Sequence, residues 1–211
     1  MPLLIAMSGK LGSGKDYIAE HYILPLIHGN VSKMAFADQI KITVASRDST
    51  VTLSQCLHGV KNAELRKKLQ IVGTEEGRDK YGPDIWINTL ENWIQLRRLR
   101  DGNPDVVLIT DCRFPNEAKW IERNGGLLIR IIAPTRNELA LSRESNGNSE
   151  VYNSIATHQS ETALDEYHFE YIVNNDPEHV VTDQVSSIFQ QYIETHPNKS
   201  RFFGTEFLTS T

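Results

Sequence analysis

The chain has 211 residues and a formal net charge of −5 at pH 7, with 22 Lys and Arg against 27 Asp and Glu. Hydrophobic residues make up 39% of the chain and charged residues 23%, which is typical of a globular protein and argues against collagen, a coiled coil or a disordered chain. A mildly acidic chain does not attract nucleic acid broadly, so we expect no nucleic-acid partner. Any anionic ligand must be held by a few placed cations.

No apolar run approaches the ~20 residues of a membrane-spanning helix, and residues 1–7 lack the basic flank of a signal peptide. We therefore expect a soluble, cytoplasmic protein without a membrane partner. Cys56 and Cys112 are the only cysteines, which argues against a disulfide framework. Cys56 lies near His58, but further ligands at zinc-finger spacing are missing. We expect both thiols to be reduced and buried.

Short apolar runs alternate with amphipathic stretches along the chain. The apolar runs predict strands at residues 3–8, 31–36, 106–110, 127–133 and 171–174. Apolar spacing of three and four residues predicts helices at 16–24, 38–45, 63–78, 83–100, 116–123, 136–142 and 178–194. This alternation predicts an α/β fold, with a five-stranded parallel sheet flanked by helices.

We expect one domain over residues 1–211, with a core formed by 1–46 and 101–195. Two predicted helices between the second and third strands exceed a simple crossover, so residues of about 47–100 are interpreted as a helical insertion over one end of the sheet. Residues 144–157 are rich in Asn, Ser and Gly, and we expect an irregular, mobile stretch there. The tail, 196–211, has no periodic pattern, although Phe202, Phe203 and Phe207 could anchor part of it.

The first predicted strand runs into Gly9-Lys10-Leu11-Gly12-Ser13-Gly14-Lys15-Asp16 and then into a helix, which is the context that a phosphate-binding P-loop requires. Glycines let backbone N–H groups converge on an anion, and the helix N-terminus adds partial positive charge. Lys15 would reach the terminal phosphates. The alternative is a glycine turn whose lysine is solvated.

Asp16 stands where a Ser or Thr hydroxyl usually ligates Mg²⁺ in a P-loop. A carboxylate is also a hard oxygen ligand and suits a helix N-terminus. Because it brings negative charge close to the phosphates, we expect Asp16 to act through the metal or a metal-bound water. The alternative is a first-turn charge that stabilises the helix.

The third predicted strand ends at Asp111, and Cys112-Arg113-Phe114-Pro115-Asn116-Glu117 follow. Ligands bind at the carboxyl ends of parallel strands, and in a P-loop fold a carboxylate here approaches the Mg²⁺ site. Arg113 suits bidentate binding of a phosphate or a salt bridge to Asp111. A simple turn with a helix cap would explain Asn116, leaves Asp111 and Arg113 unexplained, and fits Glu117 as well as a functional role does.

Polar side chains in the predicted insertion recur every four residues and share one helical stripe beside Gly73; they are Arg66, Gln70, Thr74 and Arg78. We interpret the stripe as a surface that a ligand approaches, with a solvated helix face as the alternative. Trp93 falls at helical spacing and is predicted to be core. Trp86, just after Pro83, could present its ring to a base.

Taken together, these residues resemble the deoxynucleoside monophosphate kinases of viruses and phages. The resemblance spans residues 3–175 and rests on short motifs in the same order: Ser8-Gly9, Gly12-Ser13-Gly14-Lys15-Asp16, Phe36-Ala37-Asp38-Gln39-Ile40-Lys41, Leu69-Gln70-Ile71-Val72-Gly73-Thr74-Glu75, Trp86, Asp111-Cys112-Arg113 with Glu117, and Thr157-His158-Gln159-Ser160-Glu161.

The resemblance implies a P-loop kinase that moves the γ-phosphoryl group of ATP to a deoxynucleoside 5′-monophosphate with Mg²⁺. It implies that Gly12, Ser13, Gly14, Lys15 and Asp16 hold ATP, and that the insertion binds the monophosphate. The residues expected at the monophosphate are Lys41, Arg66, Gln70, Gly73, Thr74, Trp86, Asp111, Arg113 and Glu117. Asp16 and Asp111 are the candidate metal ligands, although Asp111 also fits a substrate contact. Family members often carry a basic P-loop residue that meets the acceptor phosphate; it is Lys10 here, unless the register shifts by one toward Leu11.

Phosphoryl transfer has a loose transition state with spread negative charge, so it needs aligned oxygens and surrounding cations and no covalent nucleophile. We expect Lys15, Arg113 and Mg²⁺ to form the core of that cation set. Arg136 and Arg143 flank the mobile stretch and are candidates to close over the phosphates as a lid of about residues 136–157, or are solvated helix charges. His158 and Glu161 fit a helix-start pair equally well.

Other functions stay open at this point. The chain could be another small-molecule P-loop kinase, such as a dephospho-coenzyme A or phosphomevalonate kinase, or a nucleotide-binding module without catalysis. A homodimer is implied by the resemblance alone. Neither the preferred base nor the preference for deoxyribose follows from the sequence.

Overall fold

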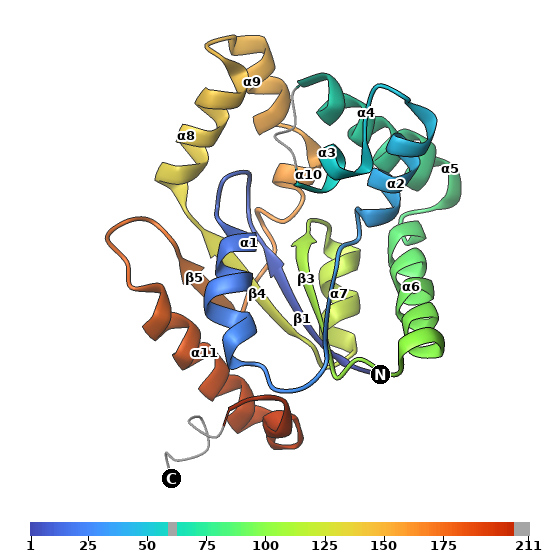
Figure 1. The fold of residues 1–211 in the computed structure, drawn as a ribbon. Helices are drawn as coiled ribbons and strands as arrows, with labels where there is room; N and C mark the ends of the chain where they lie inside the picture. Colours follow the sequence, from blue (N-terminus) through green and yellow to red (C-terminus); the bar gives the residue numbers. More distant parts are fainter. Residues whose placement is uncertain (59–62, 205–211) are drawn as a thin grey trace.

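The computed structural model describes residues 1–58 and 63–204, which form a central parallel sheet with helices around it (Figure 1). The strands are β1 (Leu3–Ser8), β2 (Val31–Met34), β3 (Val106–Cys112), β4 (Leu127–Ile132) and β5 (Tyr171–Asn174). Their order in the sheet is β2-β3-β1-β4-β5, and every neighbouring pair is parallel. The predicted α/β fold with a five-stranded parallel sheet is confirmed.

Helical segments connect the strands and cover the sheet. They are α1 (Lys15–Ile18), η1 (Ala19–Ile23), η2 (Leu24–Leu26), α2 (Asp38–Arg47), α3 (Leu53–His58), α4 (Ala63–Gly73), η3 (Thr74–Arg78), α5 (Asp79–Tyr81), α6 (Ile85–Asp101), α7 (Pro115–Arg123), α8 (Pro134–Ser145), α9 (Ser149–Ala156), α10 (Gln159–Thr162), α11 (Val181–Thr195) and η4 (Pro197–Phe202). Each helix predicted from the sequence has a counterpart, although residues 15–26 pass through α, π and 3₁₀ geometry in turn.

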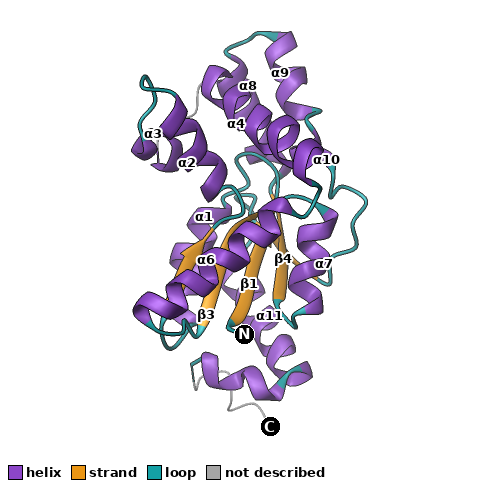
Figure 2. Ribbon diagram, turned by 90° about the vertical axis from the view of Figure 1, so that its right-hand side faces the viewer, coloured by secondary structure: helices purple, strands orange, loops and turns teal. Residues whose placement is uncertain are grey.

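Alternate residues of the strands face two separate cores. Leu3, Ile5 and Met7 of β1 pack with α1, η1 and α11, whereas Leu4 and Ala6 pack with α6 and α7 on the opposite face. Figure 2 shows α6 and α7 on one side of the strands, with α11 behind them. Strands buried on both faces are apolar throughout, which is why continuous apolar runs predicted them.

The remaining helices gather beyond the carboxyl ends of the strands, where α2, α3, α4, α8, α9 and α10 stand above the sheet (Figure 1). β1 lies at the centre of the sheet, with β3 on one side and β4 on the other. Ligands of open α/β sheets bind at the point where the strand order reverses, outside the carboxyl ends. The fold therefore places a candidate site at the end of β1.

The stretch 144–157, expected to be irregular, is mostly helical. α8 continues to Ser145, Asn146 adopts a left-handed conformation with φ of 49°, and α9 then begins at Ser149. Asn148 caps α9, because its side-chain oxygen accepts from the N–H groups of Glu150 and Val151. The Asn and Ser residues that suggested a loop are thus a turn and a helix cap.

The two tryptophans of α6 differ in burial from what the sequence predicted. Trp86 is buried at 6% exposure, whereas Trp93, expected in the core, is 37% exposed. Trp93 lies on the outer side of α6 with Leu96 and Leu99, which are also exposed. Helical spacing identified a shared stripe but not which stripe faces the sheet.

The C-terminal segment is anchored as expected for two of its three phenylalanines. Phe202 and Phe203 are buried, and the Phe203 ring lies 5.1 Å from that of Phe189. Phe207 lies outside the described residues. Cys56 and Cys112 are both free and buried, as predicted.

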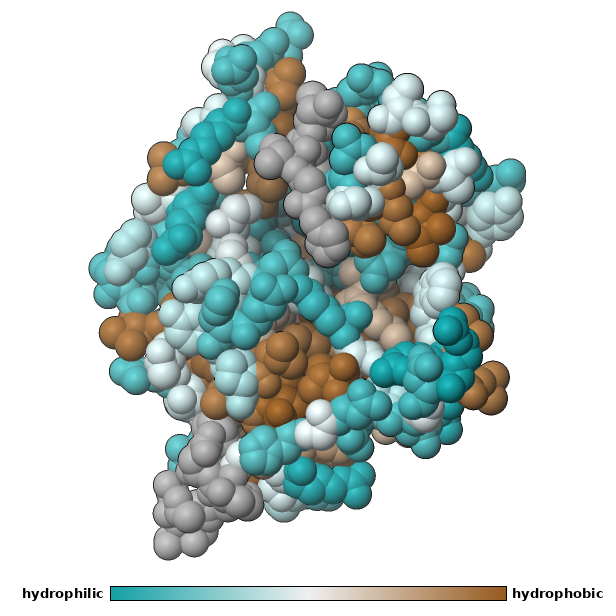
Figure 3. All heavy atoms as spheres, viewed as in Figure 1, coloured by the Kyte–Doolittle hydropathy of each residue, from teal (hydrophilic) through white to brown (hydrophobic). Residues whose placement is uncertain are grey.

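The face seen in Figure 3 is mostly hydrophilic, with small apolar areas between polar ones. Across residues 1–58 and 63–204, no helix has both the length and the apolar character needed to cross a bilayer.

Candidate functional site

The loop after β1 has the backbone geometry of an anion-binding turn. Gly12 and Gly14 adopt positive φ angles of 75° and 83°, which glycine reaches without strain. A Cβ on Gly12 would lie 2.4 Å from Cβ of Ala140 in α8. The loop therefore turns sharply directly beneath the helix that follows β4.

Lys15 begins α1 and is buried at 9% exposure. Its Nζ donates to the carbonyl oxygens of Gly9 at 2.7 Å and Lys10 at 3.1 Å. Burial, together with the nearby Arg113 guanidinium, lowers the pKa of Lys15 to about 7. Its hydrogen-bonding partners are neutral oxygens, so within the described chain its charge lacks a directly bonded carboxylate.

Asp16 follows Lys15 and points away from the core, with its side chain 70% exposed. The Thr110 hydroxyl donates to its Oδ1 at 2.8 Å, and Nζ of Lys33 lies 3.6 Å from the same oxygen. In the described residues, no group of three or more His, Cys, Asp or Glu side chains could hold a metal ion. A single exposed carboxylate beside a phosphate loop still suits Mg²⁺, which usually takes one or two carboxylates plus substrate phosphates.

Asp111 ties the end of β3 to the start of α2. Its two carboxylate oxygens accept the N–H groups of Phe36 and Ala37, each at 2.9 Å. Burial raises the pKa of Asp111, against the opposing effect of Lys41. These bonds give Asp111 a structural role at the mouth of the site, and its expected role toward metal or substrate stays a prediction.

Arg113 and Glu161 form a partly buried ion pair beside the P-loop. Nη1 of Arg113 donates to Oε1 of Glu161 and also to the carbonyl of Ser160 at 3.2 Å. The other carboxylate oxygen of Glu161 accepts the N–H of Leu11, a loop residue, at 2.7 Å. Burial alone would lower the pKa of Arg113, but the Glu161 carboxylate outweighs it and raises that pKa.

Glu117 is a cap as well as an ion-pair partner. Its Oε2 accepts the N–H groups of Arg113 at 2.8 Å and Phe114 at 3.1 Å, so Glu117 caps the backbone N–H of the residue that precedes α7. Its Oε1 accepts from Nη2 of Arg78 at 2.7 Å. Burial raises the pKa of Glu117 to about 7, and the Arg78 charge limits the rise.

Gly73 joins the polar stripe to Trp86. Its carbonyl accepts the indole N–H of Trp86 at 2.8 Å and Nη1 of Arg78 at 3.0 Å. Ile40 of α2 would lie only 3.2 Å from a Cβ at Gly73. With the indole buried and hydrogen-bonded in this way, little of the Trp86 ring is left for the base that we expected it to meet.

Arg66 connects the insertion to the end of α8, because Nη2 pairs with Oε2 of Glu144. The Nε atoms of Arg66 and Arg78 are both buried and have no hydrogen-bond partner within the described residues. Gln70 and Thr74 are half-buried between them on the same stripe. Two buried guanidinium N–H groups without acceptors are unusual, because each costs about 1–3 kcal/mol.

The other predicted lysines pair with nearby carboxylates. Lys41 Nζ donates to Oδ1 of Asp38 at 3.0 Å, one turn earlier in α2. Lys10 Nζ donates to Oδ2 of Asp165 at 2.8 Å on the exposed side of the loop. At Leu11 the backbone N–H donates to Glu161. Of these two neighbouring positions, only Lys10 has a charged side chain that could meet a phosphate.

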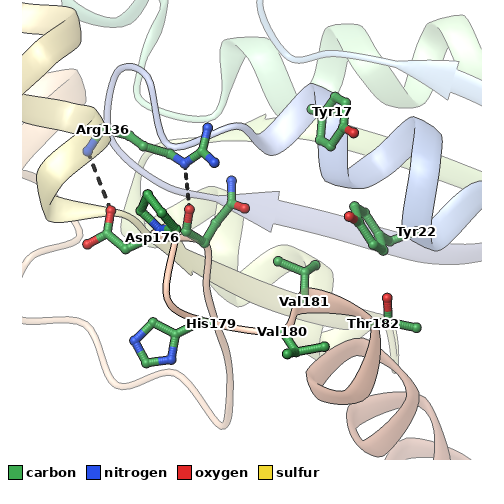
Figure 4. A pocket seen from close by; sticks show the side chains of 10 residues that line it. Tyr17, Tyr22, Arg136, Asp176, His179, Val180, Val181 and Thr182 are labelled. Atoms are coloured by element: carbon green, nitrogen blue, oxygen red, sulfur yellow. Dashed lines mark hydrogen bonds between the residues drawn. The ribbon is translucent and has the colours of Figure 1, made fainter.

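A cavity of about 440 Å³ opens beside the P-loop, between the start of α1 and the loop after β5 (Figure 4). Its lining residues are Tyr17, Tyr22, Arg136, Asn175, Asp176, Pro177, His179, Val180, Val181 and Thr182. Figure 4 shows Arg136 at one end and the two tyrosines at the other. Nε of Arg136 donates to the carbonyl of Asn175 at 2.6 Å. Arg143 lies further along α8 and is exposed, and within the described part of the chain its side chain forms no hydrogen bond or ion pair.

Sequence reasoning missed Arg130, which lies in the middle of β4. Its Nη1 donates to the Ser8 hydroxyl at 2.9 Å, and its guanidinium lies 5.3 Å from the centre of the Phe169 ring. The signal was an arginine inside the otherwise apolar run Leu-Leu-Ile-Arg-Ile-Ile. A charged side chain in a buried strand is costly unless it is paired, so this arginine pointed to a polar partner nearby.

Asn175 was also missed, although it directly follows Asn174, the last residue of β5. Its side chain is buried, and Nδ2 donates to the carbonyl of Ser13 at 2.9 Å. The next residue, Asp176, accepts the N–H groups of Thr135 and Arg136 at the start of α8. The loop after β5 thus contacts both the P-loop and the first turn of α8.

No family model matches the chain. The deoxynucleoside-5′-monophosphate kinase of Escherichia phage T5 is 32% identical to it over 98 residues, which are 44% of this chain and 37% of the phage protein. A protein of Acanthamoeba polyphaga mimivirus, provisionally described as a deoxynucleotide monophosphate kinase, is 33% identical over 149 residues. That match covers 63% of this chain and 75% of the mimivirus protein. The match to the phage protein therefore spans little more than a third of that protein.

Among solved structures, a sugar kinase from Janibacter sp. HTCC2649 has a TM-score of 0.45 at 13% identity, covering 94% of this chain and 98% of that chain. TT1252 from Thermus thermophilus has a TM-score of 0.47 at 14% identity, covering 92% and 97%. At this level of similarity neither structure bears on function.

Proposed function

Because the chain belongs to the deoxynucleoside monophosphate kinase family, we propose that it transfers the γ-phosphoryl group of ATP to a deoxynucleoside 5′-monophosphate. The reaction would produce ADP and a deoxynucleoside diphosphate. In this proposal the P-loop binds the donor, and the insertion over residues 47–100 binds the acceptor.

The observation that carries the proposal is a group of three buried or partly buried cations that lie in or directly after three adjacent strands. Lys15 follows β1, Arg113 follows β3, and Arg130 lies in β4. Arg113 and Arg130 both act to lower the pKa of Lys15, which shows that the three charges lie within each other's field. Within the described residues, Arg113 pairs with Glu161 and Arg130 lies 3.5 Å from Asp165, whereas the buried Lys15 bonds neutral oxygens and lacks a directly bonded anion, which is costly for a buried charge. A polyphosphate would supply that charge.

The donor base would occupy the cavity beside the P-loop. Asn175 connects this cavity to the loop through its bond to the carbonyl of Ser13. Tyr17 supplies an aromatic ring at one end, and Val180 and Val181 supply an apolar wall at the start of α11 (Figure 4). Arg136 at the other end could reach the ribose or the α-phosphate.

The acceptor phosphate would meet the polar stripe of α4 and η3. Arg66 and Arg78 each bury an Nε–H without an acceptor in the described residues, and a phosphate has oxygens to fill that need. Lys41 lies on α2, which packs against α4 through Ile40 and Gly73.

The chain's own residues would then act by alignment and charge. Lys15 and the loop N–H groups hold the β- and γ-phosphates, while Arg113 lies where negative charge spreads in the transition state. Bound Mg²⁺ would supply further positive charge at the β- and γ-phosphates, with Asp16 as its candidate protein ligand. The helices α8 and α9 would exclude water from the transfer. Arg143 lies on the first of these helices.

A panel of acceptors tests the proposal. Purified protein, ATP and Mg²⁺ are mixed with dTMP, dGMP, dCMP, dAMP, their ribose forms and dephospho-coenzyme A, and the initial rate of ADP formation is measured for each. We expect turnover with at least one deoxynucleoside monophosphate. Turnover with dephospho-coenzyme A alone, or ATP binding without turnover on any acceptor, would overturn the proposed reaction.

A further inference from the structure

Thr110 lies near the carboxyl end of β3, is 7% exposed, and is absent from every motif that identified the site. The register between β1 and β3 shifts beside it, since Ala6 pairs with Ile109 but Ser8 pairs with Cys112. An extra residue in one strand re-aims the side chains next to it. Here the shift accompanies a hydroxyl that donates to Oδ1 of Asp16 at 2.8 Å.

The contacts of Asp16 are concentrated on one of its two oxygens. Both the Thr110 hydroxyl and the Lys33 ammonium approach Oδ1. In the part of the chain that the structure describes, Oδ2 accepts no hydrogen bond, and the side chain is 70% exposed. A buried hydroxyl therefore fixes one oxygen of an exposed carboxylate and leaves the other facing outward beside the P-loop.

This contact brings a hydroxyl to a P-loop that lacks one after its lysine. A P-loop usually has a Ser or Thr directly after its lysine, and that hydroxyl meets the metal. Here the position holds Asp16, and the hydroxyl comes instead from Thr110 on the neighbouring strand. An exposed carboxylate that could rotate freely would spend part of its time against the phosphates, where like charges repel.

We propose that Thr110 is a positioning residue, which holds Asp16 so that Oδ2 meets the Mg²⁺ of bound ATP or a water on that ion. The inference rests on the proposed function of the donor site. It adds the residue that orients the aspartate of this loop toward the metal. Thr110 itself touches neither the nucleotide nor the acceptor. The competing explanation is that Asp16 merely satisfies a buried hydroxyl, in which case Thr110 contributes to stability alone.

Calorimetric titration with ATP separates these explanations. The dissociation constant is measured with excess Mg²⁺ and again with EDTA, and the ratio of the two values gives the gain from the metal. The ratio is formed within each variant, so a misfolded fraction lowers the stoichiometry and leaves the ratio unchanged. The variants are Thr110→Val, which keeps the shape and loses the hydroxyl, and Thr110→Ser, which keeps the hydroxyl.

A matched control is Thr89→Val in α6, because the Thr89 hydroxyl is also part-buried and donates to the carbonyl of Ile85 at 2.7 Å. We expect Thr110→Val to reduce the ratio about tenfold or more, as the loss of a hydrogen bond to a charged group predicts. Thr110→Ser and Thr89→Val should stay within about twofold of the unmodified chain. Should Thr110→Val fail to fold, Thr110→Ala takes its place.

A double-variant cycle completes the test. If Thr110 acts through Asp16, Thr110→Val should change the ratio little in an Asp16→Asn background. An unchanged ratio in Thr110→Val, or the same loss in both backgrounds, would overturn the role of Thr110 while leaving the donor site intact. No ATP binding by the unmodified chain under either condition would instead overturn the donor site, and the inference would fall with it.

Discussion

Glu117 lies beneath the first turn of α7 with its side chain 2% exposed. Burial raises the pKa of this carboxyl to about 7, from 4.5, against the opposing charge of Arg78. Between these two pH values the folded chain holds a proton that the unfolded chain releases. Stability contributed by the protonated acid is therefore present below pH 4.5 and is lost as the pH rises toward 7.

We expect Glu117→Gln, which mimics the protonated acid, to remove this part of the pH dependence. The free energy of unfolding, measured by urea at pH 5 and pH 8, should fall with pH by about 1–3 kcal/mol less in the variant than in the unmodified chain. Glu64→Gln is the matched control, since Glu64 is 74% exposed and bonds only Lys68 among the described residues. Equal pH slopes in the unmodified chain and Glu117→Gln would contradict the buried-acid account.

Arg113 and Lys41 belong to the acceptor side of the proposed site, so removing them should affect the two substrates unequally. We expect Arg113→Ala and Lys41→Ala to raise KM for the deoxynucleoside monophosphate by about 10- to 100-fold, and KM for ATP far less. Steady-state kinetics with each substrate varied in turn gives both values. Similar increases for both substrates, or none, would count against the division into donor and acceptor sides.

At the same scale, the sequence predicted the residues that belong to motifs and missed those that support them. Lys15, Asp16, Asp111 and Arg113 are predicted site residues because strand ends and glycines mark them. Thr110 could not be predicted, because a threonine in an apolar strand is ordinary and only the strand register brings its hydroxyl to Asp16. Side-chain partners that are 94 residues apart are invisible to local patterns.

Among the elements, α8 and the P-loop approach each other closely. The backbone of Gly12 passes beneath α8, so that an added Cβ would lie 2.4 Å from Cβ of Ala140 and 3.0 Å from the carbonyl oxygen of Arg136. Asp176 fixes the first turn of α8 to the loop after β5. A methyl group added at Gly12 should therefore clash with α8 and destabilise the packing of that helix on the loop.

We expect Gly12→Ala to reduce the free energy of unfolding more than Gly125→Ala does. Both glycines have positive φ angles, 75° and 61°, so both variants lose about 1–2 kcal/mol from the left-handed backbone. Only Gly12 also meets a neighbouring atom, because a Cβ at Gly125 would have nothing within 4 Å. Urea unfolding measures the difference, and equal losses would show that α8 does not press on the loop.

Helices with a long apolar periodicity were predicted correctly. A helix whose sequence shows mainly capping residues was missed. α11 and α6 carry long apolar stripes and appeared in the sequence within a few residues of their bounds. α9 was taken for an irregular stretch, because Asn148 and Ser149 favour turns as strongly as they favour helix starts. The short α3 was not predicted at all, since its six residues hold too few apolar positions to show a period.

Over the whole molecule, the parallel sheet assembles a site from segments that are far apart in the chain. β1, β3 and β4 are parallel and end at the same edge; Lys15 and Arg113 follow the first two, and Arg130 lies within the third. The alternation of apolar runs with amphipathic stretches was enough to predict this sheet. It could not predict how the insertion and α8 meet above the strand ends, because that contact depends on side chains such as Arg66 and Glu144.

The strand order also bears on how an acidic chain would bind the proposed polyphosphate. The net charge of the chain is −5, whereas at the site Lys15 is buried and the side chains of Arg113 and Arg130 are 28% and 13% exposed. A few placed charges in a low-dielectric site outweigh a weak overall field that salt screens. Binding of ATP should accordingly depend on single residues more than on ionic strength.

The central claim is that the loop lysine holds the phosphates of a donor whose terminal phosphoryl group moves to a deoxynucleoside monophosphate. Transfer of ³²P from [γ-³²P]ATP tests it most directly, with the unmodified chain and Lys15→Ala compared on the acceptor that gives the fastest rate. We predict labelled deoxynucleoside diphosphate with the unmodified chain, and none above background with a Lys15→Ala protein that retains a cooperative unfolding transition. Label transfer that persists in Lys15→Ala, or label that reaches water alone in the unmodified chain, would contradict the account.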